Sequence, residues 1–377
     1  MMRFPTLVSI LLGTVLCFTF ATTATSETQS HLRGRELKKI LLPNGKECSE
    51  NSQCENGCCV WNPFGDQVCG DDKWFNECNE GYTFVKGSMD TCGDSDGDNG
   101  LALRIMTYNL YLIFLAPDVK TLETRARRIS HWFGRSPGNG YDVIVLQETW
   151  LLPDTIRYGM TNAGYCHYVY DNRGTFGSGL AVYSKFPIEE HDFRGFGNNC
   201  AVQDCAVDKG VIYVRINKNG RKVNIFGTHA ISEVDNHDTR RLQYDVMRKF
   251  IDEQNIDSEL VILAGDFNED KINTPRKYKD MLKDLNAGEV PRAAKSPLYS
   301  YDPENNSVLD PDAPGADGVQ RALDFIFYDK SKKTLSPAEG SVCRYLLPKD
   351  HHKHDLSDHY PAGCEITFDN LVLANTK

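Results

Sequence analysis

The stretch VILAGDFNED, residues 261–270, constrains the fold more than any other part of the sequence. Its apolar start is too short for a helix and predicts a buried strand, with Gly265 allowing the backbone to turn at the strand end. Asp266 and Asn268 are two positions apart, so they point the same way from extended backbone. A carboxylate and a carboxamide placed together suit a hard cation or a phosphoryl group. A capped turn is the alternative, because Asp and Asn are common turn residues.

Residues 1–24 have the features of a signal peptide. Arg3 precedes an apolar run over residues 7–20, and the small residues Ala21 and Ala24 follow it. The run is shorter than the roughly 20 residues that span a bilayer, which favours a cleaved secretory signal. No later stretch is apolar enough to span a membrane, so we expect a soluble protein that is secreted to the extracellular space.

Cysteine usage agrees with secretion. Of the 13 cysteines, Cys17 lies in the predicted signal peptide and seven more crowd into residues 48–92. That density predicts a small disulfide-linked module, since paired Cys-x-x-Cys zinc spacing is absent, and nothing in the sequence indicates its partner. The others are Cys166, Cys200, Cys205, Cys343 and Cys364. Both groups are odd in number, so either one bridge joins them or each keeps a free thiol. Cys200 and Cys205 are close enough to staple one loop.

Two polar segments divide the chain. Residues 25–47 contain a basic cluster and are predicted to form a linker or a short pro-segment. Residues 93–100, GDSDGDNG, predict a second linker; they resemble a fragment of a calcium loop but lack its later glutamate. Residues 101–377 suffice for one large domain with a sizeable core. The formal net charge of −10 argues against a nucleic-acid partner, since phosphate backbones attract basic surfaces.

Strand-like and helix-like segments alternate in this large domain. Short apolar segments predict strands at residues 103–110, 141–148, 178–184, 210–216, 222–230, 259–266, 322–328 and 363–368. Apolar residues recur at helical spacing in 122–133, 242–250 and 278–285. Some strands follow one another at hairpin distance and others are separated by helices. This pattern predicts an α/β (α+β) fold with two sheets packed face to face and helices outside.

Polar residues lie at or near the ends of these predicted strands. They are Asn109, Glu148, Thr228 with His229, Asp266 with Asn268, Asp324, and Ser357 to His359. Taken alone, each has an ordinary explanation as a turn residue, a helix cap or a semi-buried histidine. So many polar strand ends in one domain are harder to explain in that way, and they predict a single polar site.

Six motifs of this domain resemble those of the endonuclease/exonuclease/phosphatase superfamily of metal-dependent phosphoesterases. They are MTYNLY, VLQETW, GTHA, GDFNED, LDFIF and LSDHYP, in this order. Within the superfamily, the resemblance is strongest to the secreted bacterial-type neutral sphingomyelinases, through residues 178–188, 209–230, 270–287 and 355–361. The resemblance covers roughly residues 101–369. It implies a four-layer α/β/β/α sandwich of the DNase I-like type.

The resemblance also implies roles for the acidic and amide residues. Asn109 and Glu148 match positions that hold an essential divalent cation, with Glu148 as the direct carboxylate ligand. Mg²⁺ is favoured, with Mn²⁺ or Co²⁺ as alternatives, because Mg²⁺ prefers oxygen ligands and bridges phosphate oxygens. Asp266 and Asn268 match the pair that orients the attacking water and the phosphoryl oxygens.

The histidines match acid–base groups of the same family. His359 matches the general base, and Asp324 is expected to orient its imidazole. Asp358 is expected to support the site or a metal. His229 matches the second histidine, which either stabilises the pentacoordinate phosphorus or protonates the leaving alkoxide. Two histidines and a metal meet the needs of phosphodiester hydrolysis.

The implied substrate is membrane sphingomyelin or another choline phospholipid, cut on the ceramide side of phosphorus. Lys209 and Arg240 are expected phosphate contacts, with surface salt bridges as the alternative. An aromatic residue two positions after the metal-binding glutamate touches the bilayer in this family. Here that residue is Trp150, followed by Leu151, and a buried core corner is the alternative. Between residues 328 and 355 the sequence lacks the aromatic-tipped membrane hairpin of the family, which bears on peripheral membrane binding and not on hydrolysis.

Three functions therefore remain open. The favoured one is a secreted metal-dependent sphingomyelin phosphodiesterase. Another enzyme of the superfamily, such as a nuclease or an inositol-phosphate phosphatase, is the second, although a nuclease would be expected to have a basic groove. A non-catalytic secreted binding protein, with the cysteine-rich module as its working part, is the third. It would have no chemical reason to keep every polar strand end.

Overall fold

The computed structural model describes residues 59–61, 67–69, 102–113, 119–135, 138–171, 177–232, 234–256, 259–309, 317–331, 340–350 and 353–367. The predicted signal peptide (1–24), both predicted linkers (25–47 and 93–100) and most of the cysteine-rich segment (48–92) lie outside these residues. Of that segment the structure describes an antiparallel ribbon of β1 (Cys59–Trp61) and β2 (Gln67–Cys69), with Cys59 opposite Cys69.

The strands of the large domain form two six-stranded sheets. The first sheet has the order β13-β14-β3-β4-β6-β5. Its strands are β3 (Ala102–Asn109), β4 (Val143–Gln147), β5 (His167–Tyr170), β6 (Ala181–Ser184), β13 (Val342–Tyr345) and β14 (Ala362–Thr367). The second has the order β11-β12-β10-β9-β8-β7. Its strands are β7 (Ile188–Gly195), β8 (Gly210–Lys218), β9 (Arg221–His229), β10 (Leu260–Asp266), β11 (Ala287–Glu289) and β12 (Asp324–Asp329).

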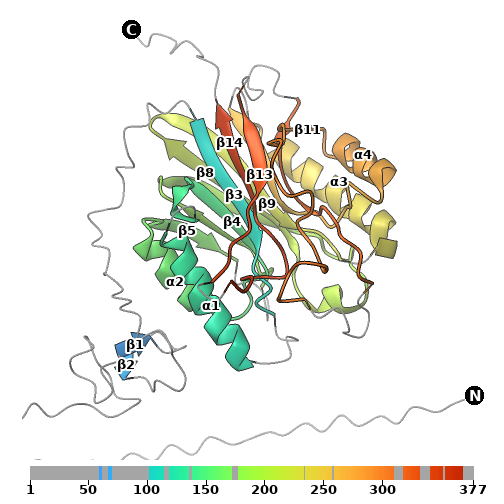
Figure 1. Ribbon diagram of the computed structural model, residues 1–377. Helices are drawn as coiled ribbons and strands as arrows, with labels where there is room; N and C mark the ends of the chain where they lie inside the picture. Colours follow the sequence, from blue (N-terminus) through green and yellow to red (C-terminus); the bar gives the residue numbers. More distant parts are fainter. Residues whose placement is uncertain are drawn as a thin grey trace, which may run out of the picture. The chain divides into compact units, whose positions relative to one another are not determined.

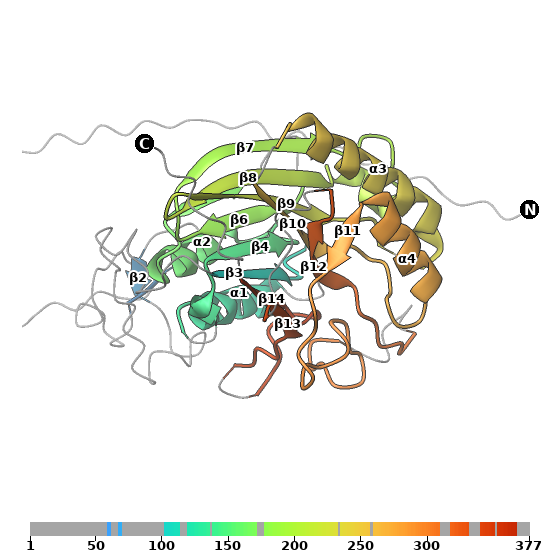
Figure 2. The same ribbon diagram turned by 90° about the horizontal axis from the view of Figure 1, so that it is seen from above.

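Helices cover the outer face of each sheet. The helices are α1 (Val119–Phe133), α2 (Pro153–Asn162), α3 (His237–Glu253) and α4 (Pro275–Asp284), with short 3₁₀ turns η4 (Gly138–Gly140), η5 (Val202–Ala206) and η6 (Val234–Asn236). The pair α1 and α2 lies on one side of the domain and the pair α3 and α4 on the other (Figures 1 and 2). The four-layer α/β/β/α sandwich predicted from the sequence is therefore confirmed.

Side-chain alternation along the strands explains this layering. In β3, Leu103 and Ile105 face the second sheet, whereas Met106 and Tyr108 face α1 and α2. Each sheet is buried on both faces, which is why its central strands are almost continuously apolar. Three apolar clusters result, one between the sheets and one under each pair of helices.

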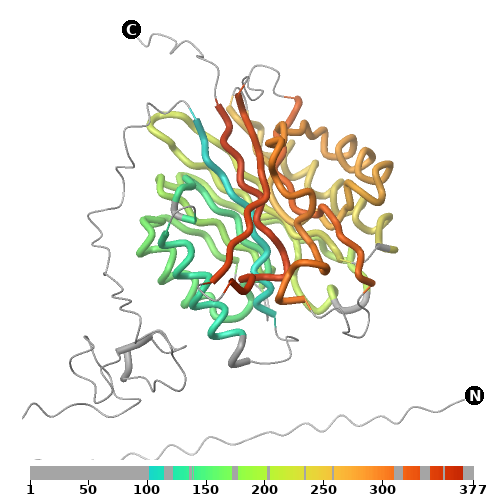
Figure 3. Tube along the Cα trace, viewed as in Figure 1, coloured from blue at the N-terminus to red at the C-terminus, as the bar shows by residue number. Residues whose placement is uncertain are grey.

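The chain returns to the first sheet at its end. The strand β14 pairs with β3, so the last strand of the chain lies beside the first strand of the domain, as the red and cyan segments of Figure 3 show. The register of the second sheet brings three polar residues together. Asp266 at the end of β10 lies opposite His229 of β9 and opposite Asp324 of β12.

The strands and helices expected from the sequence are all present, with ends shifted by a few residues. The sequence did not predict β5, β7, β11, β13 or α2. One interpretation was wrong: Gly265 does not turn the chain, since β10 continues through Asp266. Gly265 instead permits close packing, because a Cβ atom there would lie 2.1 Å from the backbone oxygen of Thr228.

The structure contains the disulfide that was expected within one loop and a second one between two strands. Cys200 and Cys205 are bridged, with Cα atoms 5.2 Å apart. Cys343 and Cys364 join β13 to β14 across directly paired positions. Cys166 is also disulfide-bonded, and its partner is none of these four. Among the described residues, none of the helices has the length and apolar character needed to cross a bilayer.

Candidate active site

The predicted site residues come together at one edge of the two sheets. The parallel strands β3 and β4 end at this edge, and so do the parallel strands β9 and β10. The antiparallel neighbours β12 and β14 begin there. Strand direction thus brings residues that are as much as 250 positions apart in the sequence into contact.

Asn109 links the carboxylates of the two sheets. Its Nδ2 atom donates hydrogen bonds of 3.1 Å both to Glu148 Oε1 and to Asp266 Oδ2. Glu148 has a backbone φ of 54°, which is unusual for a glutamate and turns its side chain into the site. Asn268 has a similar φ of 52°. Its backbone N–H donates to Asp266 Oδ1, and its side chain donates to the Ala230 carbonyl.

His359 forms a histidine–carboxylate pair with Asp324. The distance between His359 Nδ1 and Asp324 Oδ2 is 2.7 Å, and Asp266 Oδ2 lies 3.8 Å from the same nitrogen. Burial alone would lower the pKa of His359, but the carboxylates of Asp324, Asp358 and Asp266 raise it well above its usual value. Asp358 Oδ1 lies 3.1 Å from Ser357 Oγ, and burial raises the pKa of the Asp358 carboxyl group.

His229 lies on the opposite side of Asp266. Its Nε2 atom is 3.7 Å from both Glu148 Oε1 and Asp266 Oδ2, and 3.3 Å from Lys209 Nζ. Burial, with the positive charges of Lys209 and His359 adding to it, lowers the pKa of His229 well below its usual value. The imidazole is therefore neutral near pH 7.

The acidic groups fit a divalent cation. Burial and the nearby Asp358 raise the pKa of Glu148 to about 7, and burial with the nearby Asp324 raises the pKa of Asp266 to about 7. Such shifts mean that the carboxylates repel one another in a site shielded from water. Within the described part of the chain, the buried Glu148 Oε2 has no hydrogen-bond partner. A hard cation would satisfy this oxygen and offset the repulsion.

A second set of atoms has metal-ligand spacing. Ligand atoms of Asp266, Asp324 and His359 all lie within 4.8 Å of one another. In this set, however, His359 Nδ1 and Asp324 Oδ2 already satisfy each other through their 2.7 Å hydrogen bond. Glu148 Oε2, which has no hydrogen-bond partner among the described residues, is chemically the better Mg²⁺ ligand.

A pocket of about 600 Å³ opens onto these groups. Its lining includes Glu148, His229, Asp266, Asn268, Asp358 and His359. Tyr301 also lines it, and its ring contacts that of His359 edge-on at 5.5 Å between centroids. Tyr301 was not predictable from the sequence, because it lies outside any motif and its position depends on a β-bridge between its loop and the loop of His359.

Both expected phosphate contacts are buried and paired. Lys209 is 6% exposed and bonds Asp204 at 2.9 Å as well as contacting His229. Arg240 lines the pocket, but its Nε atom bonds Glu269 at 3.2 Å. Both side chains thus form salt bridges, as in the alternative interpretation, but these salt bridges are buried and not at the surface. Contact with phosphate stays a prediction for both residues.

Trp150 and Leu151 are half-buried at the edge of the site. The indole N–H donates to the Gly177 carbonyl at 3.2 Å, and the ring lies 6.3 Å from the His229 ring. Leu151 packs against the apolar cluster under α1 and α2. These contacts place both residues beside the site, and their membrane contact stays a prediction.

Arg125 and Ser357 support the site; the sequence pattern pointed to Ser357 as one of the polar strand ends, but it did not indicate Arg125. Arg125 of α1 donates to the carbonyls of Leu110 and Leu356. Ser357 Oγ donates to the Asn109 carbonyl at 2.7 Å. The two contacts tie the end of β3 to the loop that carries His359. A lone arginine on an amphipathic helix gives no sequence signal for such a role.

The fold and the site together define the class of protein. The chain belongs to the Endonuclease/Exonuclease/phosphatase family, whose match spans residues 106–359.

Individual relatives narrow the comparison. Phospholipase C of Staphylococcus aureus is 35% identical over 201 residues, which are 48% of this chain and 58% of that protein. Sphingomyelinase C of Bacillus cereus is 26% identical over 325 residues, which are 76% of this chain and 96% of that protein. A solved structure of a beta toxin double mutant from Staphylococcus aureus, with bound magnesium ions, aligns with a TM-score of 0.59 at 26% identity and covers 70% of this chain and 98% of that chain.

Proposed function

We propose that the protein is a secreted, metal-dependent phosphodiesterase that hydrolyses sphingomyelin to ceramide and phosphocholine. The observation that carries this proposal is the convergence of Glu148, His229, Asp266 and His359 on one pocket. Two imidazoles and carboxylates that can hold a metal meet the needs of phosphodiester hydrolysis. The Sphingomyelinase C relatives support the choice of substrate, and the predicted signal peptide supports secretion.

We assign the divalent cation to Glu148 and Asn109, and Mg²⁺ is the favoured ion. The unpartnered oxygen of Glu148 supports this assignment, as does the bound magnesium in the beta toxin structure. When bound, the ion would neutralise charge on the phosphoryl oxygens.

His359 acts as the general base in the form in which its imidazole is neutral. Asp324 accepts the Nδ1–H hydrogen bond, which leaves Nε2 as the nitrogen that can take a proton from water. The water oxygen forms a bond to phosphorus as the bond between phosphorus and the ceramide oxygen breaks. Asp266 and Asn268, held together by their own hydrogen bond, orient the water and the phosphoryl group.

His229 acts on the opposite side of the phosphoryl group. Its low pKa keeps the imidazole of His229 neutral. The neutral imidazole donates a hydrogen bond to the pentacoordinate phosphoryl group and stabilises it. A neutral imidazole does not give up its N–H proton near pH 7, so the ceramide oxygen takes its proton from water as the bond to phosphorus breaks. Lys209 sets the orientation of His229 through the 3.3 Å contact, and Arg240 lines the pocket where phosphate would lie.

The substrate lies in a membrane, so we infer that the protein binds bilayers peripherally, with Trp150 and Leu151 at the interface. Tryptophan and leucine are favoured there, since the ring is amphipathic and the aliphatic side chain leaves water. Both side chains are partly exposed at the edge of the site.

Phosphocholine release from sphingomyelin vesicles, with Mg²⁺ or with EDTA, tests the function. Plasmid nicking by the same preparation is measured in parallel. We expect Mg²⁺-dependent phosphocholine release without nicking. Nicking without phosphocholine release would assign a nuclease, and the absence of both activities would favour a binding protein.

A further inference from the structure

We infer that four exposed aliphatic side chains, Ile272, Leu298, Val319 and Leu347, form an apolar rim that docks the domain on a bilayer of zwitterionic choline lipids. This inference rests on the proposed function, because the substrate of the pocket is then a bilayer lipid. Each rim side chain is between 37% and 56% exposed. Among the described residues, only Tyr168 and Leu242 are large hydrophobic side chains of comparable exposure.

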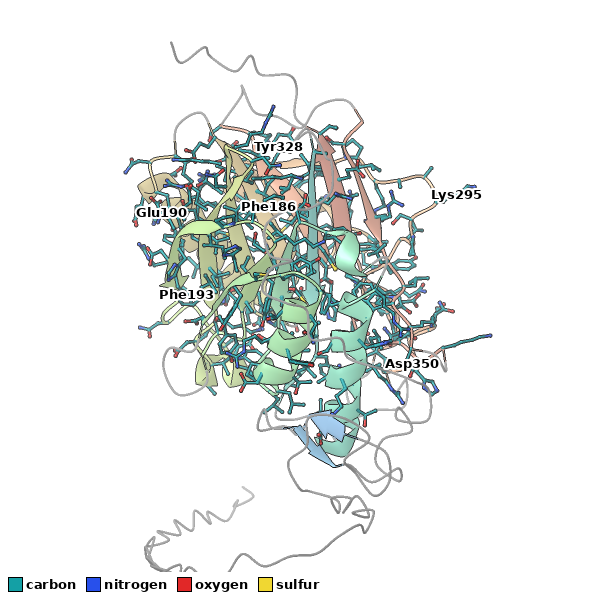
Figure 4. The ribbon with its side chains drawn as sticks, turned by 90° about the vertical axis from the view of Figure 1, so that its left-hand side faces the viewer. Phe186, Glu190, Phe193, Lys295, Tyr328 and Asp350 are labelled. Carbon is teal, nitrogen blue, oxygen red and sulfur yellow. A yellow bond between two sulfur atoms is a disulfide. The ribbon has the colours of Figure 1, made fainter. Side chains whose placement is uncertain are left out.

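Leu298 and Leu347 lie on adjacent segments that run in the same direction. Arg292 forms a parallel bridge with Cys343, and Tyr345 N donates to Ser296 Oγ at 2.8 Å. Lys295 lies three positions before Leu298, and Asp350 lies three positions after Leu347. Both project from the same side of the domain, away from Glu190 and Phe193 (Figure 4).

Both segments lead to the pocket. Tyr301, three positions after Leu298, lines the pocket. Leu346, next to Leu347, donates its backbone N–H to the carbonyl of Pro361, two positions after His359. The two exposed leucines therefore belong to chain segments that line or contact the site. Neither of them is part of an internal apolar cluster.

Ile272 and Val319 form the other part of the rim. Val319 lines the pocket, as does Asn273, the neighbour of Ile272. Asn273 Nδ2 donates to the Gln320 carbonyl at 2.8 Å, which fixes the two loops against each other. A bilayer in contact with these side chains would lie against the pocket entrance, where a lipid headgroup must enter.

The charges beside the rim select the kind of bilayer. Lys271 pairs with Glu289, Arg321 with Asp317 and Lys349 with Asp355. Each of these cations follows or precedes a rim residue by one or two positions and is already neutralised by a carboxylate of the same domain. These three cations therefore add little net positive charge beside the apolar side chains, which suits zwitterionic lipids better than anionic ones.

Vesicle flotation in EDTA measures binding without hydrolysis. The vesicles contain either phosphatidylcholine alone, phosphatidylcholine with sphingomyelin, or phosphatidylcholine with phosphatidylserine. The variants are Leu298→Ser with Leu347→Ser, and Ile272→Ser with Val319→Ser. The matched control is Leu242→Ser, since Leu242 is 54% exposed on α3 and lies outside the rim. Thermal unfolding confirms that each variant is folded.

We expect each rim variant to lose about tenfold or more in vesicle partitioning, since it replaces two exposed aliphatic side chains that the bilayer would bury. Leu242→Ser should bind like the unchanged protein, and phosphatidylserine should not strengthen binding. Unchanged binding by both rim variants would overturn the inference, as would an equal loss in the control. A dimer that sedimentation velocity finds in the unchanged protein but not in the rim variants would assign the rim to an interface between copies instead. Flotation that depends on the rim, in a protein that releases no phosphocholine, would support the rim and refute the proposed function.

Discussion

Replacing Asp324 with Asn tests the proposed base most sharply, because it changes the hydrogen bond without changing the shape of the site. The Asp324 carboxylate accepts the proton of His359 Nδ1 at 2.7 Å. An amide can instead donate to that nitrogen, which moves the imidazole proton to Nε2 and removes the lone pair that accepts a proton from water. The substitution also removes one of the negative charges that raise the pKa of His359.

The expected cost in kcat is about 10²- to 10⁴-fold, which corresponds to about 3 to 5 kcal/mol in the activation barrier. The two residues act as one unit, so His359→Gln combined with Asp324→Asn should cost no more than His359→Gln alone. The base works only in its neutral form. Since Asp324→Asn lowers the pKa of His359, the acidic limb of the profile of kcat/KM against pH should move to lower pH.

Initial rates of phosphocholine release across pH 5 to 9 measure all three effects. His359→Ala serves as the control that removes the base outright, and circular dichroism confirms its fold. A rate for Asp324→Asn within about twofold of the unchanged protein would refute the reasoning. Costs of the two substitutions that add fully in the double variant would refute it as well, because they would show that the residues act independently.

Three further substitutions test other parts of the structure. Glu148→Gln should raise the Mg²⁺ concentration for half-maximal phosphocholine release about tenfold or more, since it removes the direct carboxylate ligand; an unchanged Mg²⁺ titration would contradict the assignment. Trp150→Ala should weaken flotation with sphingomyelin vesicles more than it slows hydrolysis of a soluble phosphocholine ester, and equal effects would count against membrane contact. Gly265→Ala should lower the free energy of unfolding by about 2 to 4 kcal/mol, because the new Cβ atom would lie 2.1 Å from the Thr228 oxygen. Denaturant unfolding measures this loss, and a change below about 0.5 kcal/mol would show that the strands can separate.

The sequence predicted those parts of the fold whose pattern is set by burial. Central strands such as β10 are apolar along their whole length and are recognisable as short apolar runs. The strand β7, IEEHDFRG, was missed because it lies at the edge of its sheet and is largely exposed, so its sequence is mostly polar. The helix α2 was missed because it buries only Ile156, Gly159 and Met160, too few residues to give a helical period.

The candidate site was predictable where its residues stand at strand ends. Asp266 and Asp324 fall at such ends, and strand direction then brings them together. The environment of Lys209 was not predictable, since its burial against Asp204 depends on the loop closed by the Cys200–Cys205 bridge. Contacts between loops follow from tertiary packing, for which a sequence period carries no signal.

The central claim is that residues from both sheets converge on one divalent cation at Glu148. A crystal soaked in Mn²⁺, which prefers the same oxygen ligands as Mg²⁺, tests it directly through anomalous scattering. We expect a peak within about 2.0 to 2.3 Å of a Glu148 carboxylate oxygen. A peak coordinated by Asp324 and His359 alone, with none at Glu148, would contradict it.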